Sequence, residues 1–298
     1  MSNYIEIQNL NKFYGKKQAL SDINLFINQG MFGLLGRNGA GKTTLMKTLS
    51  TLLQKNGGSI EICGVPIEDA KGIRKIVGYL PQEFSMYPTM SVLEAMDYLG
   101  VLSGIETKER KERIEMLLKK VNLTEHKDKK VKALSGGMKR RLGIAQALLN
   151  NPKVLIVDEP TAGLDPEERI RFRNLLCDVA EDRIVILSTH IVGDIEATCE
   201  NLAILNEGSI LYNGTVSELL DTAQGKVFTK VVDKQLLPKL KKEYNIVGMH
   251  TQGKKTHIRF LSEVPVTDAE ATEPNIEDAY MLYLWRQGEK IEFTGGVQ

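Results

Sequence analysis

Short apolar runs and helically spaced apolar positions alternate along the first two thirds of the chain. The apolar run at 31–35 leads directly into Gly36, and the segment that follows it has the apolar spacing of a helix. That helix is predicted from Leu45, Leu49, Leu52 and Leu53. Strands are predicted as short alternating segments over residues 4–30, and over 31–35, 59–63, 76–80, 154–157 and 184–187.

A helical stretch interrupts these strands. It opens with a capping box formed by Ser91 and Glu94. One apolar face is then formed by Ile114, Leu117, Leu118 and Val121, and the face of a later helix by Met138, Leu142, Ala145 and Leu149. We predict a helical insertion over about residues 84–150. Because strands alternate with helices on either side of it, the core is predicted to be a doubly wound α/β fold.

The pattern changes after Gly214. Strands are predicted at 227–232 and 257–261, a lysine-rich helix near 236–244, and a last helix over 276–285. We therefore expect two domains: a main domain over residues 1–215 and a small α+β accessory domain over 216–298.

Charge and composition limit the partners. The 298 residues include 39 Lys and Arg against 38 Asp and Glu, a net charge of +1, so the chain lacks the basic excess of a protein that coats nucleic acid. We predict no nucleic-acid partner and only local phosphate binding. The three cysteines have neither the count nor the spacing of a disulfide framework or zinc site, which fits a reducing compartment.

No membrane span is expected in this sequence. The longest apolar runs, such as 154–157 and 184–187, are far shorter than the roughly 20 residues that a membrane helix needs. The first residues also lack the basic and apolar regions of a secretory signal.

The segment from Gly36 to Thr43, GRNGAGKT, matches the pattern G-x-x-x-x-G-K-[ST] between an apolar strand and an amphipathic helix. Its glycines let backbone N–H groups converge on phosphate oxygens, and the helix N-terminus adds positive potential. Lys42 brings a full charge to the terminal phosphates, and Thr43 brings a hydroxyl for Mg²⁺. This segment predicts a nucleotide-phosphate site.

Two adjacent carboxylates close the apolar strand at 154–157. Asp158 can hold Mg²⁺, directly or through water, while Glu159 can accept the proton of an attacking water. The alternative is a strand-ending turn with two solvated acids.

A Ser-Gly-Gly sequence, Ser135 to Gly137, opens the helix that carries Met138. Ser135 fits an N-cap, but a hydroxyl and free N–H groups at a helix N-terminus also form an anion site. The sequence therefore presents two phosphate-facing surfaces. Lysines and arginines surround the second, although a run of charge is also typical of a solvated face.

These motifs resemble those of the ATP-binding subunits of ABC transporters. They follow one another along residues 4–215 in the same order as in that family. The resemblance implies a RecA-like P-loop NTPase core with an antiparallel β subdomain and a helical insertion. It assigns Tyr14 to adenine stacking, Gln82 to the Q-loop, Asp165 to the D-loop and His190 to the switch position. It also assigns ATP-binding positions to Gly36, Asn38, Gly39, Ala40, Gly41, Lys42, Thr43 and Thr44, and the signature to Ser135, Gly136 and Gly137.

By this resemblance, two copies meet head to tail around ATP and Mg²⁺. Ser135 and Gly137 would bind the γ-phosphate held by the other copy, and Asp165 would organise that facing site. Gln82, with Thr43 and Asp158, would hold Mg²⁺ and position the attacking water, and His190 would contact the γ-phosphate. Taken alone, Asp165 followed by Pro166 is also a good N-cap.

The chain resembles the ATPases of ABC-2-type exporters, because it has a single nucleotide-binding domain whose sequence includes the segments LSGGMKRRLGIAQAL and VDEPTAGLDP. This implies a membrane-spanning permease as partner and a peripheral position on the cytoplasmic face of the cell membrane. The permease would insert a short helix beside residues 82–90. Arg37 and Met138 depart from the family's commoner residues, at positions where backbone groups are expected to do the binding.

Two other classes compete with a transporter. A soluble ABC ATPase acting on ribosomes or nucleic acid would share the motifs, but the ribosomal members usually carry two such domains and the chromosomal ones a long coiled coil. A P-loop kinase or GTPase would explain Gly36 to Thr43 and leave Leu134 to Gly137 unexplained.

Overall fold

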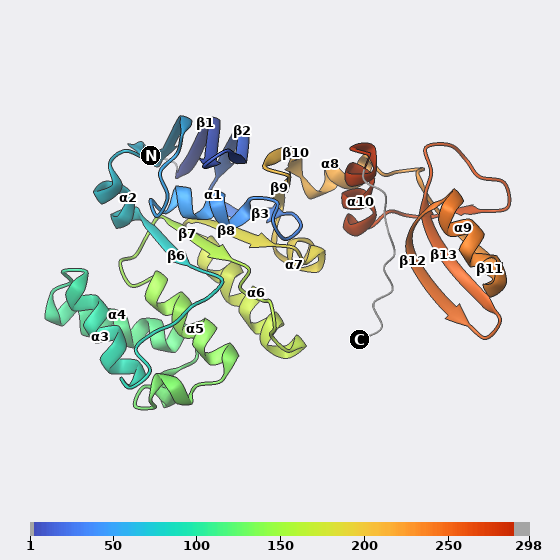
Figure 1. The fold of residues 1–298 in the computed structure, drawn as a ribbon. Helices are drawn as coiled ribbons and strands as arrows, with labels where there is room; N and C mark the ends of the chain where they lie inside the picture. The colour runs from blue at the N-terminus through green and yellow to red at the C-terminus, as the bar shows by residue number, and fades with distance from the viewer. Residues whose placement is uncertain (1–2, 289–298) are drawn as a thin grey trace. The chain divides into compact units, whose positions relative to one another are not determined.

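The computed structural model describes residues 3–288, and the chain divides between Asn213 and Gly214 into two compact units (Figure 1). The first unit contains two sheets. The four-stranded sheet has the order β2-β1-β4-β5, and the six-stranded sheet has the order β10-β9-β3-β8-β7-β6. The strands of the smaller sheet are β1 (Tyr4–Tyr14), β2 (Lys17–Asn28), β4 (Gly57–Ile62) and β5 (Val65–Pro66). Those of the larger are β3 (Gly30–Leu35), β6 (Val77–Leu80), β7 (Val154–Asp158), β8 (Ile184–Thr189), β9 (Asn201–Asn206) and β10 (Ser209–Thr215).

The two sheets differ in strand direction. Strand β1 pairs antiparallel with both β2 and β4, whereas β3 pairs parallel with β8 and β9, and β7 pairs parallel with β6 and β8. Strands β7 and β8 are buried on both faces, as the apolar runs at 154–157 and 184–187 predict. This arrangement confirms the α/β core with an antiparallel β subdomain.

Helix α1 lies between the two sheets (Figure 1). Leu45, Met46 and Leu49 of this helix share one core with residues of both sheets, such as Ile7 of β1 and Ile156 of β7. The helices of this unit are α1 (Lys42–Leu49), α2 (Ala70–Ile76), α3 (Val92–Leu102), α4 (Thr107–Lys120), α5 (Gly136–Ala147), α6 (Pro166–Ala180) and α7 (Val192–Thr198), with 3₁₀ turns at Thr124–His126 and Val131–Ala133.

Helix α1 is shorter than the sequence predicts, and the placement of Leu52 and Leu53 on it is wrong. The helix ends at Leu49 because Thr51 takes a left-handed conformation, with φ 60°. The amide of Leu52 then donates to the carbonyl of Lys47 and that of Thr51 to the carbonyl of Thr48, which are the two bonds of a Schellman motif. Leu52 is left 58% exposed.

The helical insertion forms largely as predicted. Ser91 and Glu94 make the capping box at the start of α3, with both reciprocal bonds present. Ile114, Leu117, Leu118 and Val121 are all buried, which confirms the apolar face of α4.

The second unit has its own sheet and core. The strand order is β12-β13-β11-β14, and Phe228, Ile258 and Phe260 pack against Leu237 and Leu240 of α9. The predicted strands and both predicted helices are present, while α8, β12 and β14 have no counterpart in the prediction. The elements are α8 (Val216–Asp221), β11 (Val227–Asp233), a 3₁₀ turn (Lys234–Leu236), α9 (Leu237–Glu243), β12 (Asn245–Gln252), β13 (Lys255–Leu261), β14 (Glu270–Ala271) and α10 (Ile276–Arg286).

A charged pair fastens α10 to this sheet. Asp278 is 1% exposed, and Arg259 of β13 donates to both of its oxygens, with Nε at 2.9 and 3.0 Å and Nη2 at 2.5 Å from Oδ2. Asp278 also accepts the backbone N–H of Asn275, which closes the capping box of α10. Loss of this carboxylate would leave the guanidinium of Arg259 without its opposite charge and the N–H of Asn275 without this acceptor.

We predict that Asp278→Ala lowers the free energy of unfolding of the second unit by roughly 2–4 kcal/mol. Trp285 of α10 is the only tryptophan of the sequence, so its fluorescence during urea denaturation reports on this unit. The exposed Glu277, on the same helix, provides the control, because Glu277→Ala also removes one negative charge from α10. Equal midpoints for the two variants would contradict the importance of the pair.

Candidate functional site

The predicted phosphate loop connects the end of β3 to α1. The backbone of Gly36 passes so close to the neighbouring chain that a Cβ there would lie 2.3 Å from the carbonyl oxygen of Leu205. Gly41 is the N-cap of α1 and has φ 111°, a conformation that favours glycine. These two constraints shape the loop so that it turns around the N-terminus of α1.

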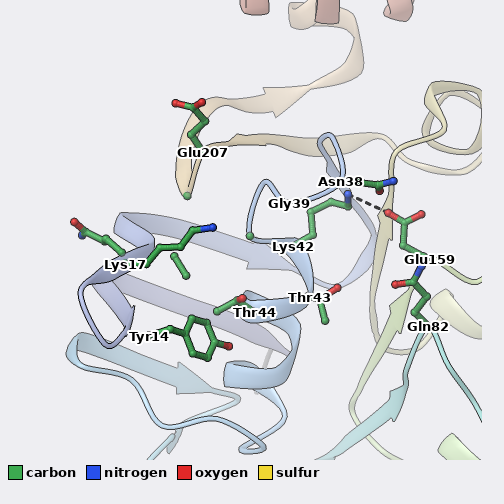
Figure 2. A pocket seen from close by; sticks show the side chains of 14 residues that line it. Tyr14, Lys17, Asn38, Gly39, Lys42, Thr43, Thr44, Gln82, Glu159 and Glu207 are labelled. Atoms are coloured by element: carbon green, nitrogen blue, oxygen red, sulfur yellow. Dashed lines mark ion pairs between the residues drawn. The ribbon is translucent and has the colours of Figure 1, made fainter.

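A pocket of about 620 Å³ opens at this loop (Figure 2). Tyr14 and Lys17 lie at one end of it, and Lys42, Glu159 and Gln82 lie at the other. Its lining comes from the end of β1, the start of β2, the phosphate loop with the start of α1, Gln82, Glu159 and the turn between β9 and β10. The lining residues are Tyr14, Lys17, Gln18, Ala19, Asn38, Gly39, Gly41, Lys42, Thr43, Thr44, Gln82, Glu159, Glu207 and Gly208.

Lys42 is held by three oxygens. Its Nζ donates to the carbonyl oxygens of Gly36 at 2.6 Å and Arg37 at 3.1 Å, and lies 3.0 Å from Oε1 of Glu159. The side chains of Lys42 and Glu159 are 5% and 4% exposed. Because an ammonium has three donors, a phosphate oxygen that binds Lys42 must replace at least one of these partners.

Glu159 also contacts the predicted switch residue. Its Oε2 lies 2.5 Å from Nδ1 of His190, which follows β8 and is 40% exposed on its side chain. The Glu159 residue itself takes a positive φ of 49° immediately after β7, with its N–H bonded to the carbonyl of Ser188. A carboxylate held between an ammonium and an imidazole at the edge of a pocket can accept a proton from a water molecule there.

Asp158 is completely buried at the end of β7. Its Oδ1 accepts a hydrogen bond from Ser188 Oγ at 2.8 Å, while its Oδ2 has no hydrogen-bond partner among residues 3–288. The Tyr79 hydroxyl, on the adjacent strand β6, is buried and likewise unbonded within that range. Burial and the negative charge of Asp158 raise the pKa of Tyr79 well above its ordinary value. An unpartnered carboxylate oxygen, with the Thr43 hydroxyl lining the pocket, fits the oxygen donors that Mg²⁺ prefers.

The signature residues lie outside this pocket. Ser135 is the N-cap of α5, where its hydroxyl accepts the N–H of Met138 at 3.2 Å, and both Ser135 and Gly136 are exposed. Gly137 is buried beside Glu168, whose Oε2 would lie 2.5 Å from a Cβ at that position. Asp165 is the N-cap of α6, as its sequence pattern indicates. One copy therefore brings together Tyr14, the phosphate loop, Gln82 and Glu159, but not Ser135 to Gly137 or Asp165.

Sequence reasoning missed the contribution of the turn between β9 and β10. Gly208 donates its N–H to the carbonyl of Ala40, and its own carbonyl accepts the N–H of Ser21, so the turn joins the phosphate loop to β2. Glu207 and Gly208 thereby reach the pocket, as do Lys17 and Gln18. The signal for this turn in the sequence is Gly208. Its contacts with Ala40 and Ser21 join residues that are distant along the chain, so sequence spacing does not predict them.

A buried aspartate lies behind Glu159 and His190. Asp194 of α7 is 0% exposed; its Oδ2 accepts the hydroxyl of Thr161 at 2.5 Å and lies 3.5 Å from that of Thr189. The guanidinium of Arg173 lies 3.7 Å from its Oδ1. Asp194 thus joins the segment that follows Glu159 to the one that precedes His190, and both to α6.

The sheet and its loop define a P-loop nucleoside triphosphatase. Residues 20–162 match the ABC transporter family. The chain is 37% identical over 233 residues to the uncharacterized ABC transporter ATP-binding protein YxlF of Bacillus subtilis, covering 78% of each chain. It is also 35% identical to the Nod factor export ATP-binding protein I of Cupriavidus metallidurans, covering 80% of each.

Solved structures agree with this likeness. One is cbiO1 from Clostridium perfringens, part of the ABC transporter complex cbiONQ, with a TM-score of 0.67 and 28% identity over 75% of this chain and 95% of that chain. Another is a dimeric ATP-binding cassette in a post-hydrolysis state bound to ADP and Pi, with a TM-score of 0.65 and 26% identity over 71% and 98%. The chain belongs to the ATP-binding proteins of ABC transporters, and it is an ATPase. None of the helices within residues 3–288 is long and apolar enough to cross a membrane.

We predict that Lys42→Ala weakens ATP binding by about 100-fold or more, because the triphosphate loses its charged donor. The affinity can be measured with a fluorescent ATP analogue. Lys47→Ala, on the same helix but away from the pocket, is the matched control and should bind as the parent does. Unchanged affinity in Lys42→Ala would remove this lysine from the phosphate site.

Proposed function

We propose that this chain hydrolyses ATP to power the export of a solute through a separate membrane-spanning subunit, as the ATPase of an ABC-2-type exporter. The observation that supports the proposal is that the two predicted phosphate-binding segments lie apart in one copy. The pocket holds Lys42 and Glu159, whereas Ser135 is exposed at the start of α5 and does not line it. A second copy is needed to bring both surfaces to one nucleotide.

Within one copy, adenine would stack on Tyr14, which is 48% exposed at the rim of the pocket. The triphosphate would follow the loop from Gly36 to Thr44, with Lys42 at its terminal phosphates. Asp158, Thr43 and Gln82 would hold Mg²⁺, which when bound neutralises phosphate charge. Glu159 would take the proton of the attacking water, and His190, in contact with Glu159, would orient that carboxylate and reach the γ-phosphate.

Between copies, Ser135 to Gly137 of one would cap the γ-phosphate bound by the other. The N-terminus of the 12-residue helix α5 supplies positive potential and N–H groups for this contact. Asp165 would face the same junction. The dimeric neighbour bound to ADP and Pi supports a paired arrangement. Loss of the γ-phosphate would remove the contacts that hold the two copies together.

This opening and closing must reach a membrane subunit for transport to occur. The segment 82–90, which follows the pocket residue Gln82, is the proposed docking region. Tyr87 within it is 43% exposed and meets the ring of Tyr98 on α3 edge to face. The chain would then lie at the cytoplasmic face of the membrane through that partner. The relative named for Nod factor export supports the export direction.

We predict that Glu159→Gln slows ATP hydrolysis by about 10²- to 10⁴-fold, the range expected for loss of a general base, while ATP is still bound. ATP should then hold the variant as a dimer, which size-exclusion chromatography with light scattering would detect. A variant that remains monomeric at saturating ATP would refute the capping role of Ser135.

The identity of the neighbouring gene and the proteins that copurify with this chain test whether it has a membrane partner. We expect a multi-span membrane protein to be encoded beside this chain and to copurify with it from detergent-solubilised membranes. Substitution of Tyr87 by Glu should reduce that copurification at least severalfold and leave the ATPase activity of the isolated chain unchanged. Recovery of ribosomes instead of a membrane protein would favour the soluble ABC ATPase.

A further inference from the structure

Helix α5 has Ser135 as its N-cap, and one side of the helix contacts the loop that follows β6. On its second turn, Arg140 Nη1 donates to the carbonyl oxygen of Gln82 at 2.6 Å. Arg140 is partly buried and has no carboxylate partner among residues 3–288. Burial lowers the pKa of its guanidinium, which still stays charged at neutral pH. A guanidinium bound in this way is directed at one backbone position instead of neutralising an acid.

A second contact fixes the same loop one turn later. Gly143 lies against Leu80 and Phe84, since a Cβ there would be 2.6 Å from Leu80 Cδ1 and 3.1 Å from the ring of Phe84. The loop is thus held at Gln82 by Arg140 and at Phe84 by Gly143. A movement of the loop backbone at these positions must be accommodated by α5.

Gln82 contacts both the pocket and α5. It lines the nucleotide pocket close to Glu159, as Figure 2 shows, while its carbonyl oxygen accepts the hydrogen bond from α5. The residue that would respond to nucleotide in a copy's own pocket is therefore bonded to the helix that offers Ser135 to the other copy. Arg140 lies five residues beyond Ser135, about 7–8 Å along a helix with a rise of 1.5 Å per residue.

Another face of α5 contacts α6, the helix whose N-cap is Asp165. Arg141 Nε lies 3.4 Å from Oε2 of Glu168 on α6, the carboxylate against which Gly137 also packs. Its Nη1 donates to the carbonyls of Val121 and Asn122 at 3.0 Å. The first turns of α5 are thus supported from two directions, and their position depends on the Q-loop through Arg140.

We propose that Arg140 is a positioning residue that couples the nucleotide state of a copy's own pocket to the placement of the Ser135 that this copy presents to its twin. The inference rests on the head-to-tail arrangement of the proposed function. When ATP draws the Gln82 side chain toward its phosphates, the carbonyl of Gln82 carries Arg140 and α5 with it. Occupancy of one pocket then prepares the cap of the other, so the two sites bind ATP cooperatively.

The test compares Arg140→Met, which keeps an unbranched apolar stem but has no donor, with Arg140→Lys, which keeps the charge and one donor group. Lys139→Met is the matched control, since it removes a charge from the next position on the same helix. For each purified full-length variant we would measure the ATP concentration for half-maximal hydrolysis, the Hill coefficient, the affinity for ADP and the melting temperature.

We expect Arg140→Met to raise the half-maximal ATP concentration by about tenfold, the factor that corresponds to 1.4 kcal/mol, and to bring the Hill coefficient down to about 1. ADP affinity should stay within about twofold of the parent, because ADP has no γ-phosphate for a twin to cap. Arg140→Lys should be intermediate and Lys139→Met parental.

Parental cooperativity in Arg140→Met would overturn the proposal, as would a Hill coefficient of 1 in the parent chain. A parallel loss of ADP affinity and melting temperature in both Arg140 variants would show a structural role and also reject it. Failure of the proposed function is distinguished by Glu159→Gln: if that variant forms an ATP-bound dimer, the dimer stands whatever Arg140 does.

Discussion

The buried contact between Lys42 and Glu159 is the constraint on which the site depends. Two opposite charges that are almost completely buried must be compensated, because removing either from water is costly. The carbonyls of Gly36 and Arg37 and the imidazole of His190 provide the remaining partners. This set of contacts joins the ends of β3, β7 and β8, which are adjacent in the sheet, and it places the Glu159 carboxylate beside the loop that precedes α1.

In the proposed dimer, one copy is only part of the catalytic apparatus. Lys42 and Glu159 line one pocket, and Asp158 precedes Glu159 at the end of β7, but the exposed end of α5 does not line that pocket. A hydrolysis reaction divided in this way can report on whether two molecules are in contact. Helix α5 suits such a role because its side is bonded to the Q-loop and to α6, while its N-terminus remains available.

The second unit is held by different forces. Its core of Phe228, Ile258 and Phe260 is closed by α9, and Asp278 fastens α10 to Arg259. Of its residues up to 288, none lines the pocket at the phosphate loop. Its stability and the chemistry of the pocket can therefore be altered separately by substitution.

Local patterns in the sequence were sufficient for much of this protein. The phosphate loop, the capping box at Ser91 and the N-caps at Ser135 and Asp165 depend on neighbours within a few residues, so spacing alone predicts them. The apolar strands at 154–157 and 184–187 were equally clear, because both of their faces are buried. The end of α1 was not, since a threonine instead of a glycine takes the left-handed position.

Tertiary structure alone decided the contacts between distant segments. No spacing in the chain relates Gln82 to Arg140, Ala40 to Gly208, or Thr161 to Asp194. These pairs meet because strand order in the sheet differs from order in the sequence, and packing then selects which loops touch. The sequence by itself therefore determined which groups have the chemistry expected of a nucleotide site, whereas the fold decided which of them share a pocket and which remain on a separate surface.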